Sequence, residues 1–254
     1  MPPRHHIDRL RAAEPAQGFA QLDPDTFMSP GSFDAALRAV GGACAAVDAV
    51  LQGDDSTAFV IARPPGHHAA AATPMGFCLF GTVAIAAKHA LTRLNRVAVV
   101  DFDVHHGNGT QDLLWHEPRA LFIGSHQMPL WPGTGTRAER GAHGQIVNLP
   151  LAPGSDGATM RKLYEAEAFP VLDAFAPDLI LISAGSDAHA DDPLAGLNWQ
   201  AEDYAWLTGR LCDLADRHCQ GRVVSCLEGG YDLAALTASV AAHVAVLQER
   251  SHGR

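Results

Sequence analysis

Short apolar runs alternate along the chain with longer stretches rich in alanine and leucine, and this alternation constrains the fold more than any other feature. Such alternation is typical of βα units and a parallel sheet. The runs are apolar on both faces, as expected for strands that helices cover on either side. The predicted strands are Ala58–Ala62, Val97–Val100, Leu121–Ile123, Ile146–Leu149, Leu179–Ser183 and Arg222–Leu227. The predicted architecture is a single-domain, three-layer α/β/α fold with a central parallel sheet.

Helical patterns fill most of the segments between these strands. Ser32 and Ser155 are suited to cap the first turns of two helices, because serine side chains accept hydrogen bonds from free N–H groups there. The predicted helices are about Phe33–Leu51, Leu79–Arg93, Thr110–His116, Ala158–Ala176, Ala201–His218 and Leu233–Glu249.

Charge and cysteine content exclude several classes of protein. The formal net charge is −10, so we expect no direct binding of nucleic acid, which requires a basic face. No apolar run of about 18 residues predicts a membrane span, and the N-terminus lacks the apolar core of a signal peptide. The cysteines are scattered without a C-x-x-C pair, which argues against a disulfide framework or a structural zinc site. We therefore expect a cytoplasmic protein.

Polar segments that contain glycine or proline directly follow four of the predicted strands. These segments are Arg63–His68, Asp101–Gly109, Ala184–His189 and Leu227–Asp232. The carboxyl ends of parallel strands lie on one edge of the sheet, where ligands bind in such folds. The packing of the fold does not require this arrangement, whereas a functional site does.

Aspartate and histidine residues at two of these strand ends have the spacing of metal ligands. Asp101, Asp103 and His105 alternate with period two, so an extended backbone places them on one face. Neighbouring carboxylates are costly unless a cation or a proton neutralises them. With Asp187 from another strand end, Asp103 and His105 make a three-ligand divalent site with an open position. The alternative is a solvated turn, which is the better interpretation of an isolated Asp-x-His.

Three further side chains are candidates for acid–base and oxyanion chemistry. His67 and His68 can act as general acid and base, since imidazole titrates near neutral pH. Asp101 and Asn108 are available to hold their other ring nitrogens. Tyr231 follows two glycines, which allow its phenol to reach the site and donate a hydrogen bond to a developing oxyanion. The alternatives are a chance His-His pair and a tyrosine packed on an ordinary turn.

Two aromatic residues on predicted loops, Phe77 and Trp131, suit the walls of a narrow apolar channel. As isolated residues they are more often explained by simple packing. Cys78 lacks the surroundings of a catalytic cysteine and is predicted to be a small buried hydrophobe.

Six motifs, in order along the chain, resemble those of the zinc-dependent histone deacetylase superfamily. They are RPPGHH, GFC, DFDVHHGNGTQ, PLWPGTG, SAGSDAHADDPLAGL and LEGGYD. Glu228 and Asn108 favour the class II-like bacterial branch, which includes acetylpolyamine amidohydrolases and acetoin-utilisation-type proteins. The resemblance assigns residues 21–254 to a deacetylase-like catalytic domain and residues 1–20 to a partly mobile N-terminal remnant.

The resemblance also implies a role for each candidate residue. It implies that one Zn²⁺ binds to Asp103, His105 and Asp187. It implies that Tyr231 donates to the oxyanion and that His67 pairs with Asp101 and His68 with Asn108. It places along the substrate tunnel Gly76, Phe77, Trp131 and Leu194. It places a potassium ion at Asp101, Asp103, His105 and Ser125.

The sequence departs from the family pattern in two places. Ser186 stands where the family usually has phenylalanine, next to the proposed ligand Asp187. The family's opening strand, helix and histidine–proline loop are not found, so we expect the domain to lack that N-terminal segment. One alternative is that the sequence is truncated. Otherwise the tunnel entrance would be wider, or a second copy in a homo-oligomer would cover it.

The combined prediction is zinc-dependent hydrolysis of an acetyl or short acyl amide. The reaction would release acetate and a free amine from acetyl-lysine, in a small molecule or a peptide, or from an acetylated polyamine. Because Asn108 cannot ionise, His68 is predicted to lose its proton more readily than His67. One alternative is a dinuclear manganese ureohydrolase, because Asp187–Asp191 has the D-A-H-x-D spacing of such enzymes. The other is a family member that binds zinc but has lost turnover.

Overall fold

Six parallel strands form the central sheet, in the order β3-β8-β7-β4-β5-β6. The computed structural model describes residues 2–251. Every pair of neighbouring strands is parallel, which confirms the predicted sheet. The strands are β3 (Thr57–Val60), β4 (Val97–Asp101), β5 (Ala120–Gln127), β6 (Ile146–Leu151), β7 (Leu179–Ala184) and β8 (Val223–Leu227).

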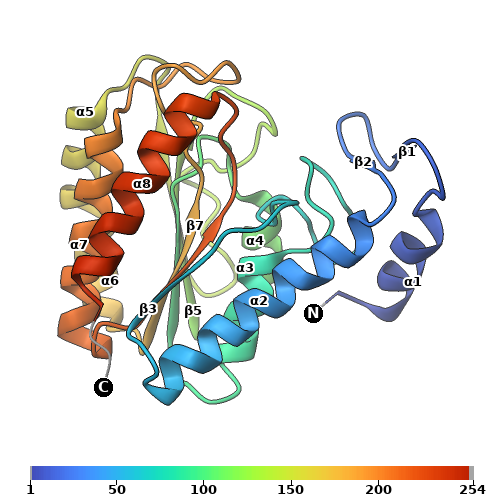
Figure 1. Ribbon diagram of the computed structural model, residues 1–254. Coiled ribbons are helices and arrows are strands. Elements are labelled where there is room, and N and C mark those ends of the chain that lie inside the picture. Colours follow the sequence, from blue (N-terminus) through green and yellow to red (C-terminus); the bar gives the residue numbers. More distant parts are fainter. Residues whose placement is uncertain (1, 252–254) are drawn as a thin grey trace.

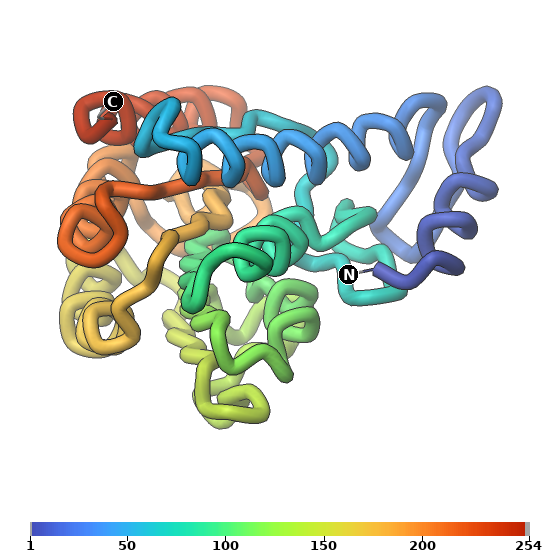
Figure 2. The backbone as a smooth tube through the Cα atoms, turned by 90° about the horizontal axis from the view of Figure 1, so that it is seen from below, coloured from blue at the N-terminus to red at the C-terminus, as the bar shows by residue number. Residues whose placement is uncertain are grey.

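Helices cover both faces of the sheet and complete the three predicted layers (Figure 1, Figure 2). On one face lie α2 (Ser32–Gln52), α3 (Thr82–Ala90) and α4 (Asn108–Leu114). On the other lie α5 (Gly157–Leu163), η1 (Tyr164–Ala168), α6 (Phe169–Phe175), α7 (Ala201–Cys219) and α8 (Leu233–Glu249). Within residues 2–251, no helix combines the length with the apolar sequence that a membrane span requires.

Alternate side chains of β4 enter two separate hydrophobic cores. Val97 and Val99 belong to the core that α2 and α3 cover, whereas Ala98 and Val100 belong to the core that α7 covers. All four side chains are buried. Because neither face of the strand meets solvent, its sequence is apolar throughout.

Both predicted serine caps are wrong. Asp156, rather than Ser155, caps α5, because its carboxylate accepts a hydrogen bond from the Thr159 N–H at 2.8 Å. A carboxylate also interacts favourably with the positive end of the helix dipole. Ser32 is the first residue of α2, and the cap position is taken by Gly31 at φ +88°, without a side-chain hydrogen bond.

The predicted helix Ala158–Ala176 is continuous but not uniform. The single π turn of η1 joins α5 to α6. Pro170 lies in the first turn of α6. A proline there has no N–H to donate to the preceding turn, which accounts for the local departure from α-helical geometry.

The N-terminal segment forms a helix that the sequence analysis did not predict. Helix α1 (Arg4–Ala13) precedes a small antiparallel hairpin of β1 (Ala20–Gln21) and β2 (Phe27–Met28). Its residues His6 and Leu10 are fully buried. The His6 ring nitrogen Nε2 lies 3.1 Å from the carbonyl oxygen of Leu79, so α1 packs against the segment that leads into α3.

Candidate active site

The carboxyl ends of four adjacent strands bring the polar segments together, as the sequence predicts. The strands β3, β8, β7 and β4 are consecutive in the sheet. The segments that follow them carry, in this order, His67 and His68, Tyr231, Asp187, and Asp103 with His105.

Asp103, His105 and Asp187 form the one cluster of potential metal ligands within residues 2–251. One ligand atom from each residue lies within 4.8 Å of the others. His105 Nδ1 is 3.2 Å from Asp103 Oδ1 and 3.1 Å from Asp187 Oδ2. Ligand atoms about 2.1 Å from a tetrahedral zinc are about 3.4 Å apart, so both distances from His105 Nδ1 are close to those between the ligands of a zinc site.

Backbone groups orient both carboxylates of this cluster. The Gly229 N–H donates to Asp103 Oδ2 at 2.8 Å, and the Val104 N–H donates to Asp187 Oδ1 at 2.9 Å. A Cβ at either Gly229 or Gly185 would lie 2.2 Å from one of the two carboxylates. The close approach of backbone and carboxylate therefore requires glycine at both positions.

The charges in this cluster depend on one another. Burial and the negative charge of Asp103 raise the pKa of Asp187 to about 7. Burial opposes a charge on His105, but hydrogen bonds to the two carboxylates outweigh it and raise the pKa of the imidazole to about 10. Two buried carboxylates thus attract positive charge, which a divalent cation provides when it displaces the His105 proton.

His67 and His68 lie side by side next to these residues, with ring centroids 3.9 Å apart. His67 Nδ1 is 3.0 Å from Asp101 Oδ2, and His68 Nδ1 is 2.8 Å from Asn108 Oδ1. Each histidine therefore contacts the partner expected from the sequence. Of the two, only His68 lines the cavity described below.

The two histidines have opposite pKa shifts. Burial disfavours the charged form of both, but at His67 the carboxylates of Asp103 and Asp101 outweigh it and raise the pKa well above its usual value. Burial and the positive charge of His67 lower the pKa of His68 well below its usual value. The hydrogen bond to Asn108 acts in the opposite direction and raises the pKa of His68, so the lowered pKa does not come from the neutral partner. The acid and base roles of the two histidines stay a prediction.

Tyr231 approaches the same residues from the segment after β8. Its ring makes an edge contact with Phe77 at 5.9 Å, and the Arg63 guanidinium lies 5.8 Å from its centroid. Its backbone N–H donates to Asp192 Oδ2 at 2.7 Å. Burial and the negative charges of Asp103 and Asp187 raise the pKa of the phenol, which therefore remains a hydrogen-bond donor.

A cavity of about 200 Å³ leads to these side chains. The Trp131 ring lies 4.7 Å from that of His68, measured between centroids. The cavity is lined by all four residues expected along the tunnel, which are Gly76, Phe77, Trp131 and Leu194. It is also lined by Asp25 and Leu130, which sequence reasoning missed. Cys78, by contrast, is fully buried, and burial raises the pKa of its thiol, as expected for a packing residue.

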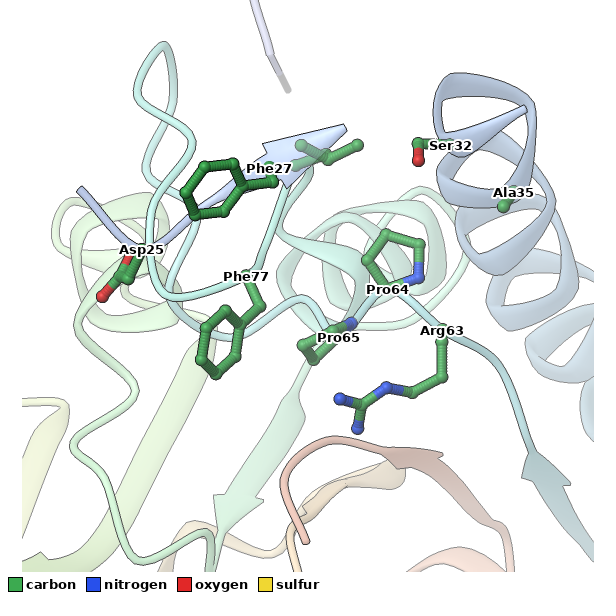
Figure 3. A pocket seen from close by; sticks show the side chains of 9 residues that line it. Asp25, Phe27, Ser32, Ala35, Arg63, Pro64, Pro65 and Phe77 are labelled. Carbon is green, nitrogen blue, oxygen red and sulfur yellow. The ribbon is translucent and has the colours of Figure 1, made fainter. Parts of the chain in front are cut away.

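A larger cleft, of about 650 Å³, adjoins this cavity (Figure 3). Asp25 and Phe77 line both spaces. Phe27 contributes from β2, Ser32 from α2, and Arg63 from the segment after β3. The N-terminal hairpin and α2 therefore border the approach to the smaller cavity.

Ser125 contacts a residue that the sequence analysis did not foresee. Its hydroxyl is 2.8 Å from the hydroxyl of Tyr164, in the π turn. Ser125 follows Gly124, which pairs with Asp101 across β4 and β5. The potassium ion assigned to Asp101, Asp103, His105 and Ser125 stays a prediction.

The comparison with known proteins assigns the family. The family model described as a histone deacetylase domain matches residues 3–247. The chain belongs to the histone deacetylase family. The match begins inside residues 1–20, the segment that sequence reasoning separated from the catalytic domain.

Three relatives illustrate this membership in the histone deacetylase family. A probable deacetylase of Archaeoglobus fulgidus is 43% identical over 84% of this chain and 60% of its own. A histone deacetylase-like amidohydrolase of Pseudomonas aeruginosa is 38% identical over 90% of this chain and 62% of its own. A crystal structure of an acetylpolyamine aminohydrolase from Burkholderia pseudomallei aligns with a TM-score of 0.81 at 32% identity, over 89% of this chain and 66% of that chain. The chain thus spans about two thirds or less of the length of these relatives.

Ser186, which departs from the histone deacetylase pattern, donates hydrogen bonds to the segment after β8. The Ser186 N–H donates to the Gly229 carbonyl at 2.8 Å, and its hydroxyl reaches the same oxygen at 3.3 Å. Ser186 therefore ties the segment after β7 to the segment that carries Tyr231.

Proposed function

We propose that the protein is a zinc-dependent amidohydrolase that removes an acetyl or short acyl group from a linear amine. The observation that carries this proposal is the placement of His68 and Tyr231 beside the Asp-His-Asp cluster, at the end of a cavity with apolar walls. The narrow cavity suits an extended chain that bears the amide at its tip.

Asp103, His105 and Asp187 would hold the zinc ion. Bound zinc supplies a Lewis acid that polarises the amide carbonyl and makes water a stronger nucleophile. The remaining steps belong to side chains of the chain itself.

His68 is the proton carrier of the proposed reaction. Neutral and facing the cavity, it accepts a proton from the attacking water and returns it to the leaving amine nitrogen when the C–N bond breaks. His67, held by Asp101, keeps its positive charge behind His68 and stabilises the negative charge that develops on the substrate. Tyr231 donates its phenol hydrogen to the carbonyl oxygen as this oxygen becomes an oxyanion.

The proposed substrate is acetyl-lysine, free or in a peptide, or an acetylated polyamine. Each carries its amide on a flexible aliphatic chain that would enter the cavity lined by Phe77 and Trp131. The net charge of −10 and the carboxylate of Asp25 at the cavity favour an amine with further positive charge.

The dinuclear ureohydrolase alternative receives less support from the site. His189, which would be a ligand of a second ion, accepts a hydrogen bond from the Asp191 N–H at its Nδ1. His67, His68 and Tyr231 would also have no evident use in such an enzyme. A zinc-binding protein without turnover is the other alternative, and the complete set of proposed catalytic groups argues against it.

A substrate panel on zinc-loaded protein tests the proposal. Acetyl-lysine peptides, acetylputrescine, and arginine with agmatine would be compared, each with and without a chelator. We expect chelator-sensitive hydrolysis of an acetyl amide, at one zinc per chain by metal analysis. Turnover of a guanidine substrate with two metal ions per chain would favour the ureohydrolase. Absence of turnover on every substrate would favour the non-catalytic alternative.

A further inference from the structure

A buried carboxylate that the proposed mechanism does not use lies behind the histidine pair. Glu228 directly follows β8 and is 0% exposed. Burial raises the pKa of its carboxyl group to about 7. Its hydrogen-bond partners are backbone N–H groups and a hydroxyl rather than a basic side chain. A buried acid of this kind is costly, so its contacts point to a specific requirement.

Three donors converge on this carboxylate. Glu228 Oε2 accepts from the Gly66 N–H at 2.6 Å and from the His67 N–H at 3.1 Å. Glu228 Oε1 accepts from the Ser183 hydroxyl at 3.2 Å. The Arg63 guanidinium also donates to the Glu228 backbone carbonyl at 2.7 Å. Glu228 thereby joins the ends of β7 and β8 to the turn that carries the histidine pair.

The same turn is held from its other side by α4. The Thr110 N–H donates to the His67 carbonyl at 3.0 Å. Both the N–H and the carbonyl of His67 are therefore fixed, the first by Glu228 and the second by α4. The peptide units around His67 cannot rotate without losing one of these bonds, so its ring stays directed at Asp101.

We infer that Glu228 is a positioning residue for the histidine pair, and that its carboxylate fixes the Gly66 and His67 N–H groups so that His68 meets the substrate at the correct place. This inference rests on the proposed function. Glu228 acts through the turn, since its carboxylate bonds neither His68 nor the proposed metal ligands. A catalytic group misplaced by about 1 Å can lose about 10²-fold in rate.

Two variants separate position from charge. Glu228→Ala removes all three acceptor contacts. Glu228→Gln keeps the shape, because its amide oxygen can accept from the two N–H groups while its NH₂ group donates to the Ser183 hydroxyl. A matched control is Asp203→Ala, which removes another buried carboxylate, one that accepts from Arg161 and from the Gln200 N–H at the start of α7.

Steady-state kinetics on zinc-loaded protein give the first measurement. We expect Glu228→Ala to lower kcat about 10²-fold with KM within about threefold of wild type, and Glu228→Gln to recover most of kcat. Asp203→Ala should lower the melting temperature without changing kcat. An unchanged kcat in Glu228→Ala, or a higher KM alone, would overturn the inference. A Glu228→Gln variant as slow as Glu228→Ala would assign the effect to charge instead of position.

Hydrogen exchange gives a second measurement that needs neither zinc nor turnover. Peptides spanning residues 61–70 should exchange faster in Glu228→Ala than in wild type, and Glu228→Gln should restore the protection. Unchanged exchange in Glu228→Ala would refute the inference even if activity fell. If the wild-type protein hydrolyses no amide, the proposed function fails and this measurement alone decides the role of Glu228. If Glu228→Ala does not fold, Glu228→Asp, whose carboxylate is one methylene shorter, is judged by the same criteria.

Discussion

Gly229→Ala tests the proposed zinc site directly, because it adds a single methyl group between two of the proposed ligands. The Gly229 N–H bonds Asp103, and its Cα faces the carboxylates of both Asp103 and Asp187. The substitution changes no charge and removes no polar group. Its effect on metal binding should therefore report the packing around the cluster alone.

The expected magnitude follows from the distances. A Cβ at position 229 would lie 2.2 Å from Asp187 Oδ2 and 2.5 Å from Asp103 Oδ2. Since a carbon–oxygen contact needs about 3.3 Å, each carboxylate must retreat by about 1 Å. Metal sites tolerate only about 0.2 Å in ligand distance, and disturbed ligand orientation alone costs about 10- to 100-fold in affinity. We expect zinc affinity to fall at least about 100-fold, which corresponds to about 2.7 kcal/mol.

Competition with a chromophoric chelator measures this affinity directly. The matched control is Gly209→Ala in α7, where the new Cβ would meet only Val246 Cγ1, at 3.9 Å. The control should bind zinc like wild type and should be more stable by about 0.5–1 kcal/mol, because alanine favours a helix interior over glycine. A folded Gly229→Ala protein that binds zinc within threefold of wild type would refute this account of the cluster.

Three further predictions concern the phenol, acid stability and assembly. Tyr231→Phe should lower kcat about 10²-fold and leave zinc affinity unchanged, because it removes only the donor to the oxyanion; unchanged turnover in steady-state assays would refute that role. Burial lowers the pKa of His243 from 6.5 to about 4, so its contribution to stability is complete above pH 6.5 and is lost as the pH falls towards 4. Between pH 7 and pH 4.5, the free energy of unfolding measured with urea should fall less for His243→Gln than for wild type, by up to about 3 kcal/mol. An equal fall in both proteins would contradict this. Light scattering at working concentration tests the predicted homo-oligomer, which a clean monomer would rule out.

The fold and the candidate residues were accessible from sequence because both depend on short-range patterns. The apolar runs end where polar segments begin, so strand ends such as Asp101 and Leu227 could be found without long-range information. The period-two argument for Asp103 and His105 assumed an extended backbone, and this premise is wrong, because β4 ends at Asp101 and both residues lie in a bend. The bend still brings His105 Nδ1 within 3.2 Å of Asp103 Oδ1. The fold class was confirmed by the parallel sheet.

Several features that depend on tertiary contacts were not predicted. Helix α1 has little apolar character of its own, and burial of His6 and Leu10 against other elements stabilises it. The roles of Asp192 and Glu228 arise from hydrogen bonds to backbone N–H groups far away in sequence. Sequence shows that a carboxylate is present beside a motif, but not which N–H group it will meet. The nearest signal for such a role in the sequence is an acidic residue directly before a motif glycine, as at Glu228 and Gly229.

If the proposed zinc site is correct, the acidic groups buried at the edge of the sheet would make the amount of folded protein depend on the supply of metal. Asp101, Asp103, Asp187 and Glu228 are each at most 1% exposed. A cation that binds the folded chain but not the unfolded one adds about 2.7 kcal/mol at a hundredfold excess over its dissociation constant. In a zinc-starved cell, more of the chain would unfold transiently and be removed by proteases. The cellular amount of this protein would then rise and fall with available zinc, even at constant gene expression.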